Sequence, residues 1–511
     1  MGRLENPGFL VGVATSGYQC EGGFNGPGDP QNNWASHETA GRAARTGDAT
    51  AFWTRYREDF ELCRGIGLNA FRLSIEWARV QPTRSAVSGR APDFDFAAMD
   101  AYADRIAACR EAGLEPVVTL HHFTHPAWLG VDAWLDDGTP ERFEAFVVAT
   151  VGRVNRRLTA HHGQPPVGWY VTLNEPNMLV FNTYVSRYFP GGPAGGIAVS
   201  ARAYNRLLAA HVRAYNAIHD LYESERWPAP RVALNTFCSD VYWSENLLLD
   251  LLSLRANGVA PHRAPDYFLA REAGLRRALE GCRAGCRNDF IAGIGRGVHR
   301  LTDFFAKRAA TADGFAFFLN EAARSKRERV LDFLGLDYYD PFLAHIFRSP
   351  DFSDLEFPGG SLHARLMAGL SSKSWDWHIL PEGLHAFCGH YAAAFPGLGI
   401  LIAENGMALR CKADNKFCGS RRDSVLRSDF LGTHLREVRR LLDDGIPLLG
   451  YLHWSLTDNY EWGSFTPRFG LYRVDYANGL VRRAEDHLGD NPSKTYARLI
   501  RELRLGGAAV Q

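Results

Sequence analysis

The chain has 511 residues, which is enough for one large barrel or for two to three ordinary domains. Its 57 Lys and Arg balance its 57 Asp and Glu, so the formal net charge is zero and no global field favours a nucleic acid or an anionic membrane as partner. A composition with 46% hydrophobic and 22% charged residues is typical of a folded soluble protein and excludes wholesale disorder.

Short apolar runs alternate with stretches of helical periodicity along the whole chain. The runs predict eight strands at Leu10–Thr15, Ala70–Ile75, Pro116–Leu120, Gly168–Leu173, Val232–Asn235, Phe333–Leu336, Ile400–Ala403 and Leu448–Leu452. The other stretches predict helices over Ala51–Arg64, Phe96–Glu111, Glu141–His161, Ala201–Tyr222, Thr302–Arg324, Glu382–Ala394, Arg427–Asp443 and Pro492–Leu505. Eight such βα repeats predict an α/β fold, a single closed (β/α)8 TIM barrel that occupies residues 1–511 as one domain.

A doubly wound open sheet is the alternative, but its site would gather at one switch point, whereas a barrel draws polar groups from every strand end. Polar side chains lie within or just after nearly every predicted strand, which favours the barrel. Arg72 and Asn235 lie within strands, and the others are Gln19, Glu76, His121, His122, Asn174, Glu175, Asp337, Tyr339, Glu404, Asn405 and His453. Residues 240–328 are long for one connection. We expect helices there around Asn246–Leu254 and Tyr267–Leu279, and we expect the segment to overhang the barrel mouth.

The nine cysteines have irregular spacing, unlike a secreted disulfide framework, so most are expected to be buried free thiols. Neither Cys282 with Cys286 nor Cys411 with Cys418 has the spacing of a zinc ribbon, and both pairs are expected to be incidental. Residues 1–12 contain no apolar run like that of a signal peptide, and no segment reads as a membrane span. A cytoplasmic location is therefore expected.

Two of the predicted strands deliver a glutamate at their ends. Residues 169–176 read WYVTLNEP and present Asn174 with Glu175, and residues 400–406 read ILIAENG and present Glu404. If the two carboxyl groups lie about 5 Å apart, one can attack an anomeric carbon while the other protonates the leaving oxygen, as in retaining glycosidases. We expect Arg72 and Tyr339 to keep Glu404 ionised, while the charge of Glu404 raises the pKa of Glu175. The alternative is two glutamates in structural ion pairs.

Four more segments have recognisable patterns: residues 9–22 (FLVGVATSGYQCEG), 71–77 (FRLSIEW), 118–128 (VTLHHFTHPAW) and 450–462 (GYLHWSLTDNYEW). With the two glutamate motifs, in this order and over nearly the whole chain, the sequence resembles glycoside hydrolase family 1, the retaining β-glucosidases and β-galactosidases of (β/α)8 fold. The resemblance implies that Glu175 is the acid/base and Glu404 the nucleophile, and that no cofactor or metal is needed.

The same resemblance implies a set of contacts to a small β-glycoside substrate. Asn174 would lie near the sugar 2-hydroxyl, Trp454 would form the floor under the ring, and Trp377 would be a platform for the aglycone. The remaining contacts to the glycone would come from Gln19, His122, Glu461, Trp462 and Phe469. Sugars have polar edges and apolar faces, which polar groups and aromatic planes satisfy respectively.

Two positions depart from the pattern that the family usually shows. Asp337 stands where the family has Asn, and we expect its charge to raise the pKa of the nucleophile unless it pairs with a cation. Phe123 stands where the family has Trp, which is expected to loosen contact with the sugar 3-hydroxyl. Retention of Glu461 argues against phosphorylated sugars, because a fixed carboxylate repels a phosphate dianion.

Other functions are compatible with parts of the sequence. A metal-dependent hydrolase is one alternative, suggested by His121, His122 and His125. A two-histidine metal site usually has both residues on one helix, and Pro126 and the strand context are incompatible with that spacing. A transglycosidase could use the same glutamates, and a non-catalytic sugar-binding barrel would be consistent with Asp337 and Phe123. The preferred interpretation is hydrolysis of terminal β-D-glucosides, with β-galactosides and β-fucosides as secondary substrates. The sequence does not predict the natural aglycone or the oligomeric state.

Overall fold

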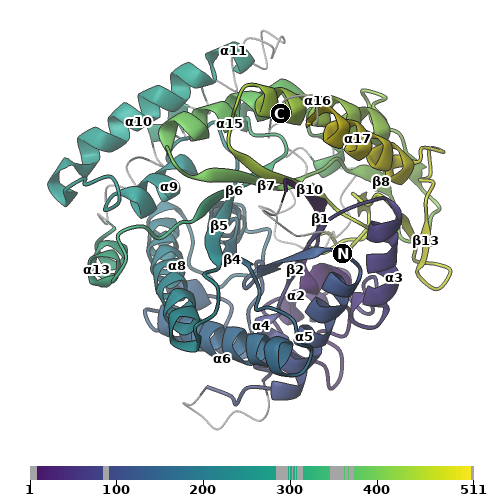
Figure 1. Cartoon of the computed structure of the whole chain (residues 1–511), viewed down its shortest axis with the longest axis horizontal. Helices are drawn as coiled ribbons and strands as arrows, with labels where there is room; N and C mark the ends of the chain where they lie inside the picture. Colours follow the sequence, from purple (N-terminus) through teal and green to yellow (C-terminus); the bar gives the residue numbers. More distant parts are fainter. Residues whose placement is uncertain are drawn as a thin grey trace.

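The computed structural model describes residues 8–83, 91–283, 315–345 and 373–507, with isolated positions between 297 and 366. Eight parallel strands close into a barrel in the order β1-β10-β7-β6-β5-β4-β3-β2, and the chain passes once around it (Figure 1). They are β1 Leu10–Ala14, β2 Ala70–Ser74, β3 Glu115–Thr119, β4 Trp169–Asn174, β5 Arg231–Phe237, β6 Phe333–Tyr338, β7 Gly399–Asn405 and β10 Leu448–Trp454. All eight predicted strands and the barrel are confirmed.

A layer of helices surrounds the barrel (Figure 1). They are α3 Phe52–Gly65, α5 Phe96–Glu111, α6 Thr139–Ala160, α8 Ile197–Glu225, α13 Ala316–Arg324, α15 Pro381–Ala394, α16 Arg427–Asp443 and α17 Pro492–Gly507. Helix α5 has the predicted bounds because the Asp95 side chain accepts from the Ala98 N–H at 3.0 Å, and Gly113, at φ 81°, allows the chain to turn away after it. No helix in the described ranges is long and apolar enough to cross a membrane.

The long segment between β5 and β6 adds helices to the outer layer. Helices α9 Asn246–Ser253 and α10 Ala264–Ala278 confirm the two predicted there, and α11 Glu280–Arg283 follows. Helix α10 contacts α15, and α13 contacts α8, so these helices extend the outer layer. Most of residues 302–314, where the predicted Thr302–Arg324 helix begins, lie outside the described residues. That the segment overhangs the barrel mouth stays a prediction.

Short elements in the loops were not expected from the sequence. They are the helices α1 Gly17–Cys20, α2 Ala35–Thr39, α4 Trp77–Val80 and α7 Pro176–Val180, a small sheet of β8 Leu409–Cys411, β9 Cys418–Gly419 and β11 Pro467–Arg468, and the pair β12 Arg473–Asp475 and β13 Val481–Arg483. Each has too few residues to carry a readable period.

The cysteine pair in the small sheet corrects one expectation. Cys411 and Cys418 are partners across β8 and β9 and form a disulfide, so they are not incidental. The disulfide could not be predicted from the spacing of the two cysteines, because only the pairing of β8 with β9 brings them together. The other described cysteines are free, and all but the half-buried Cys282 are buried, as expected: Cys20, Cys63, Cys109, Cys238 and Cys388. Cys286 lies outside the described residues.

Candidate active site

Three carboxyl groups meet at the carboxyl ends of the barrel strands. Glu175 directly follows β4, Asp337 lies near the end of β6, and Glu404 lies near the end of β7. All three are buried, and one carboxyl oxygen of each lies within 4.8 Å of one oxygen of each of the others. Parallel strands in a barrel end on the same face, so residues far apart in sequence converge there. The structure thus brings together the two glutamates that the strand pattern directed to one pocket.

Glu404 is held by two donors, one for each carboxyl oxygen. Arg72 Nη1 donates to Oε1 at 2.7 Å, and the Tyr339 hydroxyl donates to Oε2 at 2.9 Å. Burial raises the pKa of Glu404 above its usual range, although the charge of Arg72 and the hydrogen bonds from Tyr339 and Arg72 oppose this rise. These are the two supports that the sequence suggested for this carboxylate.

Glu175 has a different environment. Burial raises its pKa well above the usual range, and the charges of Asp337 and Glu404 raise it further. The charge of Asp337 was expected to raise the pKa of Glu404, but in the structure it chiefly raises the pKa of Glu175. The backbone of Glu175 is left-handed, with φ 38°, immediately before Pro176 begins α7. Such strain in a non-glycine residue is typical of functional positions. Glu175 keeps its proton to higher pH than Glu404 does.

Asn174 is oriented by a network that the sequence only partly indicated. Its Oδ1 accepts from Arg72 Nη2 at 2.5 Å and from Asn235 Nδ2 at 2.8 Å, while Arg72 Nε donates to Thr119 Oγ1 at 2.9 Å. The buried Asn174 Nδ2 has no hydrogen-bond partner in the described part of the chain. A buried amide without a partner costs free energy, so a ligand oxygen that accepts a hydrogen bond from Asn174 Nδ2 would stabilise the site.

A second cluster of hydrogen-bonded polar side chains surrounds Glu461. Trp454 Nε1 donates to Glu461 Oε1 at 2.9 Å, and Gln19 Nε2 donates to Glu461 Oε2 at 3.2 Å and to Asn459 Oδ1 at 3.3 Å. Burial raises the pKa of Glu461 to about 7, against the opposing hydrogen bonds from its donors. The sequence predicts Gln19, Trp454 and Glu461 as site residues. It does not predict Asn459, because no sequence pattern distinguishes this residue.

Aromatic rings complete this side of the site. His122 stacks on Trp454 and Trp462, with ring centroids 5.7 and 5.8 Å apart, and Phe123 meets Trp462 edge-on at 4.9 Å. Burial lowers the pKa of His122 well below its usual range, so the ring is neutral, and its Nδ1 has no partner among the described residues. Phe123 and Trp462 are both left-handed, at φ 67° and 43°. His122 and Trp462 thus lie together with the Glu461 group.

The histidines that could suggest a metal do not converge. His121 packs edge-on against Trp134, and its ring centroid is 6.4 Å from that of His125. Within the described ranges, no group of three His, Cys, Asp or Glu with ligand atoms within 4.8 Å includes His121, His122 or His125. These residues give the metal interpretation no support.

Two further aromatic residues flank Tyr339 near the nucleophile. The Trp377 ring centroid lies 5.4 Å from that of Tyr339, and the Phe469 centroid lies 6.2 Å from it. Arg421 Nη2 donates to the Trp377 carbonyl at 2.6 Å and so fixes the backbone of that segment. Both aromatic residues expected from the sequence therefore adjoin the carboxyl group cluster, while Arg421 was not anticipated.

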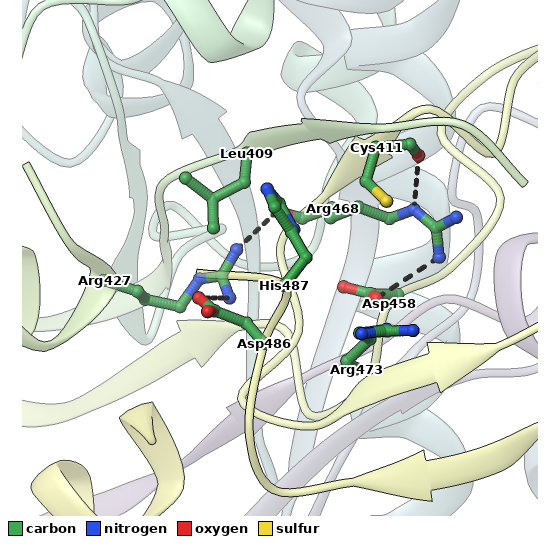
Figure 2. A pocket seen from close by; sticks show the side chains of 8 residues that line it. All are labelled: Leu409, Cys411, Arg427, Asp458, Arg468, Arg473, Asp486 and His487. Carbon is green, nitrogen blue, oxygen red and sulfur yellow. Dashed lines mark hydrogen bonds and ion pairs between the residues drawn. The ribbon is translucent and has the colours of Figure 1, made fainter. Parts of the chain in front are cut away.

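Arginine side chains in structural roles line a small pocket (Figure 2). Its lining residues are Leu409, Cys411, Arg427, Asp458, Arg468, Arg473, Asp486 and His487. Arg427 donates to the carbonyls of Arg468 at 2.6 Å and Gly470 at 2.8 Å, on either side of Phe469. Arg468 donates to Asp458 Oδ2 at 3.3 Å and to the Cys411 carbonyl at 2.8 Å (Figure 2). The bonds from Arg427 position the backbone on both sides of Phe469. The guanidinium groups of Arg427 and Arg468 therefore have structural roles.

Gly406, the last residue of the second glutamate motif, makes a close approach that no side chain permits. A Cβ atom there would lie 2.1 Å from the carbonyl oxygen of Trp454. We expect Gly406→Ala to lower the free energy of unfolding by about 3 kcal/mol, because the backbone of β10 cannot yield easily. Urea denaturation measures this. Gly432→Ala in α16, where a Cβ meets nothing within 4 Å, is the control and should be neutral or stabilising; equal losses would contradict the argument.

The chain matches a known family along most of its length. The sequence profile of Glycosyl hydrolase family 1 matches residues 5–235 and 299–499. A bifunctional β-D-glucosidase/β-D-fucosidase of Bifidobacterium breve is 28% identical over 486 residues, covering 92% of this chain and 93% of that protein. A 6-phospho-β-galactosidase of Clostridium acetobutylicum is 25% identical over 484 residues, with 92% of each covered.

Solved structures agree on the fold. A β-glucosidase from Thermotoga maritima in complex with castanospermine superposes with a TM-score of 0.67, at 22% identity, over 98% of both chains. The gap in the match, residues 236–298, begins at the end of β5 and lies mostly in the long segment that follows it. The chain therefore belongs to glycosyl hydrolase family 1 and is a glycoside hydrolase built on a (β/α)8 barrel.

Proposed function

We propose that this glycoside hydrolase is a retaining β-glucosidase that acts on terminal non-reducing β-D-glucosides, with β-galactosides and β-fucosides as secondary substrates. Glu404 is the nucleophile and Glu175 the acid/base. The observation that carries the proposal is that a carboxyl oxygen of Glu175 lies within 4.8 Å of one of Glu404. Retaining enzymes hold their two carboxyl groups about 5 Å apart, whereas inverting enzymes need about 6.5–9.5 Å to admit a water molecule between carboxylate and sugar.

The reaction follows from the unequal protonation of the two groups. Glu404 attacks the anomeric carbon as the bond to the leaving oxygen breaks, and Glu175 gives its proton to that oxygen. Glu175, now a carboxylate, then takes a proton from water, which attacks the same carbon and releases Glu404. Two inversions retain the β configuration. Of the two glutamates, Tyr339 and Arg72 donate hydrogen bonds to the nucleophile, so both stabilise its anion in the free enzyme and as the leaving group in the second step.

Sugar recognition is supported by buried polar atoms that lack partners. Asn174 Nδ2 and His122 Nδ1 are two such atoms, and a sugar hydroxyl can satisfy each. We assign Asn174 to the 2-hydroxyl and Gln19, His122, Glu461 and Trp462 to the other glycone hydroxyls, with Trp454 under the ring. Phe469 flanks the primary alcohol, Phe123 backs Trp462, and Trp377 is the platform for the aglycone.

A neutral sugar fits this site better than a phosphorylated one. The similar proteins include both a β-glucosidase/β-fucosidase and 6-phospho-β-galactosidases, so similarity alone does not choose between them. Glu461 hydrogen-bonds to the neutral Gln19 and Trp454, and neither supplies the positive charge that a phosphate dianion needs. The ionised form of Glu461 repels a phosphate.

A panel of nitrophenyl glycosides that differ only in the sugar tests the proposal. We expect the highest kcat/KM on the β-glucoside, lower values on the β-galactoside and β-fucoside, and no turnover of 6-phospho-β-glycosides or α-glucosides. Proton NMR of the first product should show the β anomer of the free sugar. An α anomer as the first product, or preference for the phosphorylated substrates, would refute the proposal. Added alcohol reports how far glycosyl transfer competes with hydrolysis.

Arg72 should control the acid side of the pH profile. It lowers the pKa of Glu404, so replacement of Arg72 by Met should raise that pKa, and the nucleophile would then be ionised only at higher pH. The acid limb of kcat/KM should move up by about 1–3 pH units. Arg72→Lys retains the charge and should move the limb less. An unmoved acid limb in the Met variant would contradict the role given to Arg72.

We also propose that residues 1–511 form one catalytic domain and that the enzyme is cytoplasmic. The single closed barrel, with β1 near the start of the chain and α17 near its end, supports the first proposal. The free thiols support the second: six of the described cysteines are free and five of these are buried, against the one disulfide between Cys411 and Cys418. Separation of cells into cytosolic and exported fractions, with activity followed in each, tests the location.

A further inference from the structure

Asp337 is a carboxyl group in the site that the reaction described above does not use. Its side chain has no exposed surface, and it lies between Glu175 and Glu404 in the barrel order of β4, β6 and β7. Among the described residues one cation faces these groups: Arg72 Nη1 is 2.7 Å from Glu404 and 4.0 Å from Asp337. Three ionised carboxylates beside one guanidinium would leave two negative charges without compensation in a buried site, which favours retention of a proton.

Hydrogen bonding indicates which carboxyl group holds that proton. Asp337 Oδ2 accepts from Asn235 Nδ2, and its Oδ1 is buried without an N–H or O–H donor in the described part of the chain. Burial and the charge of Glu404 raise the pKa of Asp337 well above its usual range, whereas Arg72 and the hydrogen bonds from Glu175 and Asn235 lower it and so stabilise its negative charge. No N–H group in the described ranges donates to the Glu175 carboxyl. One carboxyl oxygen of Glu175 lies within 4.8 Å of one of Asp337. Two carboxyl groups can share a hydrogen bond only when one of them is protonated.

We propose that Asp337 is a positioning residue for the acid/base: its carboxylate accepts a hydrogen bond from protonated Glu175 and so keeps the proton on the residue that must deliver it. The inference rests on the proposed retaining mechanism. Hydrogen bonding to Asp337 raises the pKa of Glu175, in addition to burial and the charges of Asp337 and Glu404. The titratable or charged groups that face Asp337 are Arg72 on β2, Glu175 after β4, Cys238 after β5, Tyr339 after β6 and Glu404 on β7.

The arrangement keeps the charge of the site constant through the reaction. In the free enzyme Asp337 and Glu404 are ionised and Glu175 is protonated. When Glu175 gives its proton to the leaving oxygen, Glu404 loses its charge to the new ester bond, so two negative charges remain, on Asp337 and Glu175. When water donates a proton to Glu175 and its oxygen replaces Glu404 at the anomeric carbon, the starting charges return. Asp337 keeps its charge throughout and is an acceptor whenever Glu175 is protonated.

The prediction concerns the alkaline limb of the pH profile, where Glu175 loses its proton. Asp337→Asn removes a negative charge and supplies an N–H donor, which stabilises ionised Glu175 and lowers its pKa. We expect the alkaline limb of kcat/KM for a phenyl β-glucoside to move to lower pH by about one unit or more. A dinitrophenyl β-glucoside, whose leaving group needs no proton, should show a much smaller shift. A merely structural role would affect both substrates alike.

Asp340→Asn is the matched control. Asp340 lies three residues along the same segment and accepts from His345 and His378 instead of Glu175, so its replacement should leave the alkaline limb in place. An Asp337→Asn limb that coincides with the wild-type limb would overturn the inference while leaving the hydrolase intact. Wild-type enzyme that turns over neither glucoside would instead overturn the proposed function.

A titration that needs neither turnover nor a variant at position 337 decides the same question. Carbon-13 NMR of enzyme labelled at the glutamate and aspartate carboxyl carbons follows each group directly, with the Glu175 signal assigned by its loss in Glu175→Gln. We expect the Glu175 carboxyl to titrate well above its usual range while the Asp337 carboxyl stays ionised at neutral pH. A protonated Asp337 beside an ionised Glu175 at neutral pH would overturn the inference, even if Asp337→Asn failed to fold.

Discussion

Replacement of Glu404 by Gly lowers the kcat of β-glucoside hydrolysis on the order of 10⁵-fold, with little change in fold, if this residue is the nucleophile. The carboxylate forms the covalent bond to the sugar, so no neighbouring group replaces it. Arg72 and Tyr339 would keep their places but lose the anion that they bind. Steady-state kinetics with circular dichroism as the check on folding measure the loss.

Azide separates this role from a structural one. In Glu404→Gly the space on the α face is open, so azide should restore turnover of a dinitrophenyl β-glucoside and give the α-glucosyl azide by a single inversion. Glu437→Gln in α16, whose half-buried side chain pairs with Arg440 at 3.4 Å, is a control that should retain wild-type rates. A β-azide from the Glu404 variant, or substantial activity without azide, would contradict the assignment.

Replacement of Glu175 by Gln should reduce kcat/KM for poor leaving groups by about 10²- to 10⁴-fold, because these need a proton at the glycosidic oxygen. The loss should be much smaller for a dinitrophenyl β-glucoside, whose leaving group departs as an anion. A Brønsted plot of log kcat/KM against the leaving-group pKa measures the difference. The slope should be steeper for the variant than for the wild type.

The product formed with azide provides an independent check on Glu175. Azide should accelerate the second step in Glu175→Gln and give the β-glucosyl azide, since the covalent intermediate on Glu404 is still formed and is attacked from the opposite face. The two variants therefore differ in the anomer that they release. Equal losses of kcat/KM for good and poor leaving groups would contradict the acid role.

The barrel could be predicted from the sequence because its strands and helices are long enough to display their periods. Helix α5 is a clear case, since Asp95 caps its start and Gly113 follows its end. The loops could not be predicted in the same way. Strands such as β8 and β9 are two or three residues long, and only their pairing makes Cys411 and Cys418 neighbours.

The two glutamates of the site could also be predicted from the sequence, because a carboxylate at the end of an apolar strand has no structural reason to be there. Glu175 and Glu404 were found in this way, and the supports of Glu404 are Arg72, within β2, and Tyr339, directly after β6. The partners of these groups were harder to foresee. Asn235 bridges Asn174 and Asp337, and this depends on strand stagger rather than on any pattern within one segment. The direction in which Asp337 acts, toward Glu175, likewise follows only from the assembled barrel.

The most direct test is to trap the covalent sugar. A 2-deoxy-2-fluoro-β-glucoside with a dinitrophenyl leaving group forms the glycosyl-enzyme quickly and releases it slowly, so the adduct can be isolated and digested. Mass spectrometry should then find one fluoroglucosyl group, attached through an ester to Glu404 in the peptide that contains residues 400–406. An unlabelled enzyme that still hydrolyses β-glucosides, or an adduct on any other residue, would contradict the mechanism.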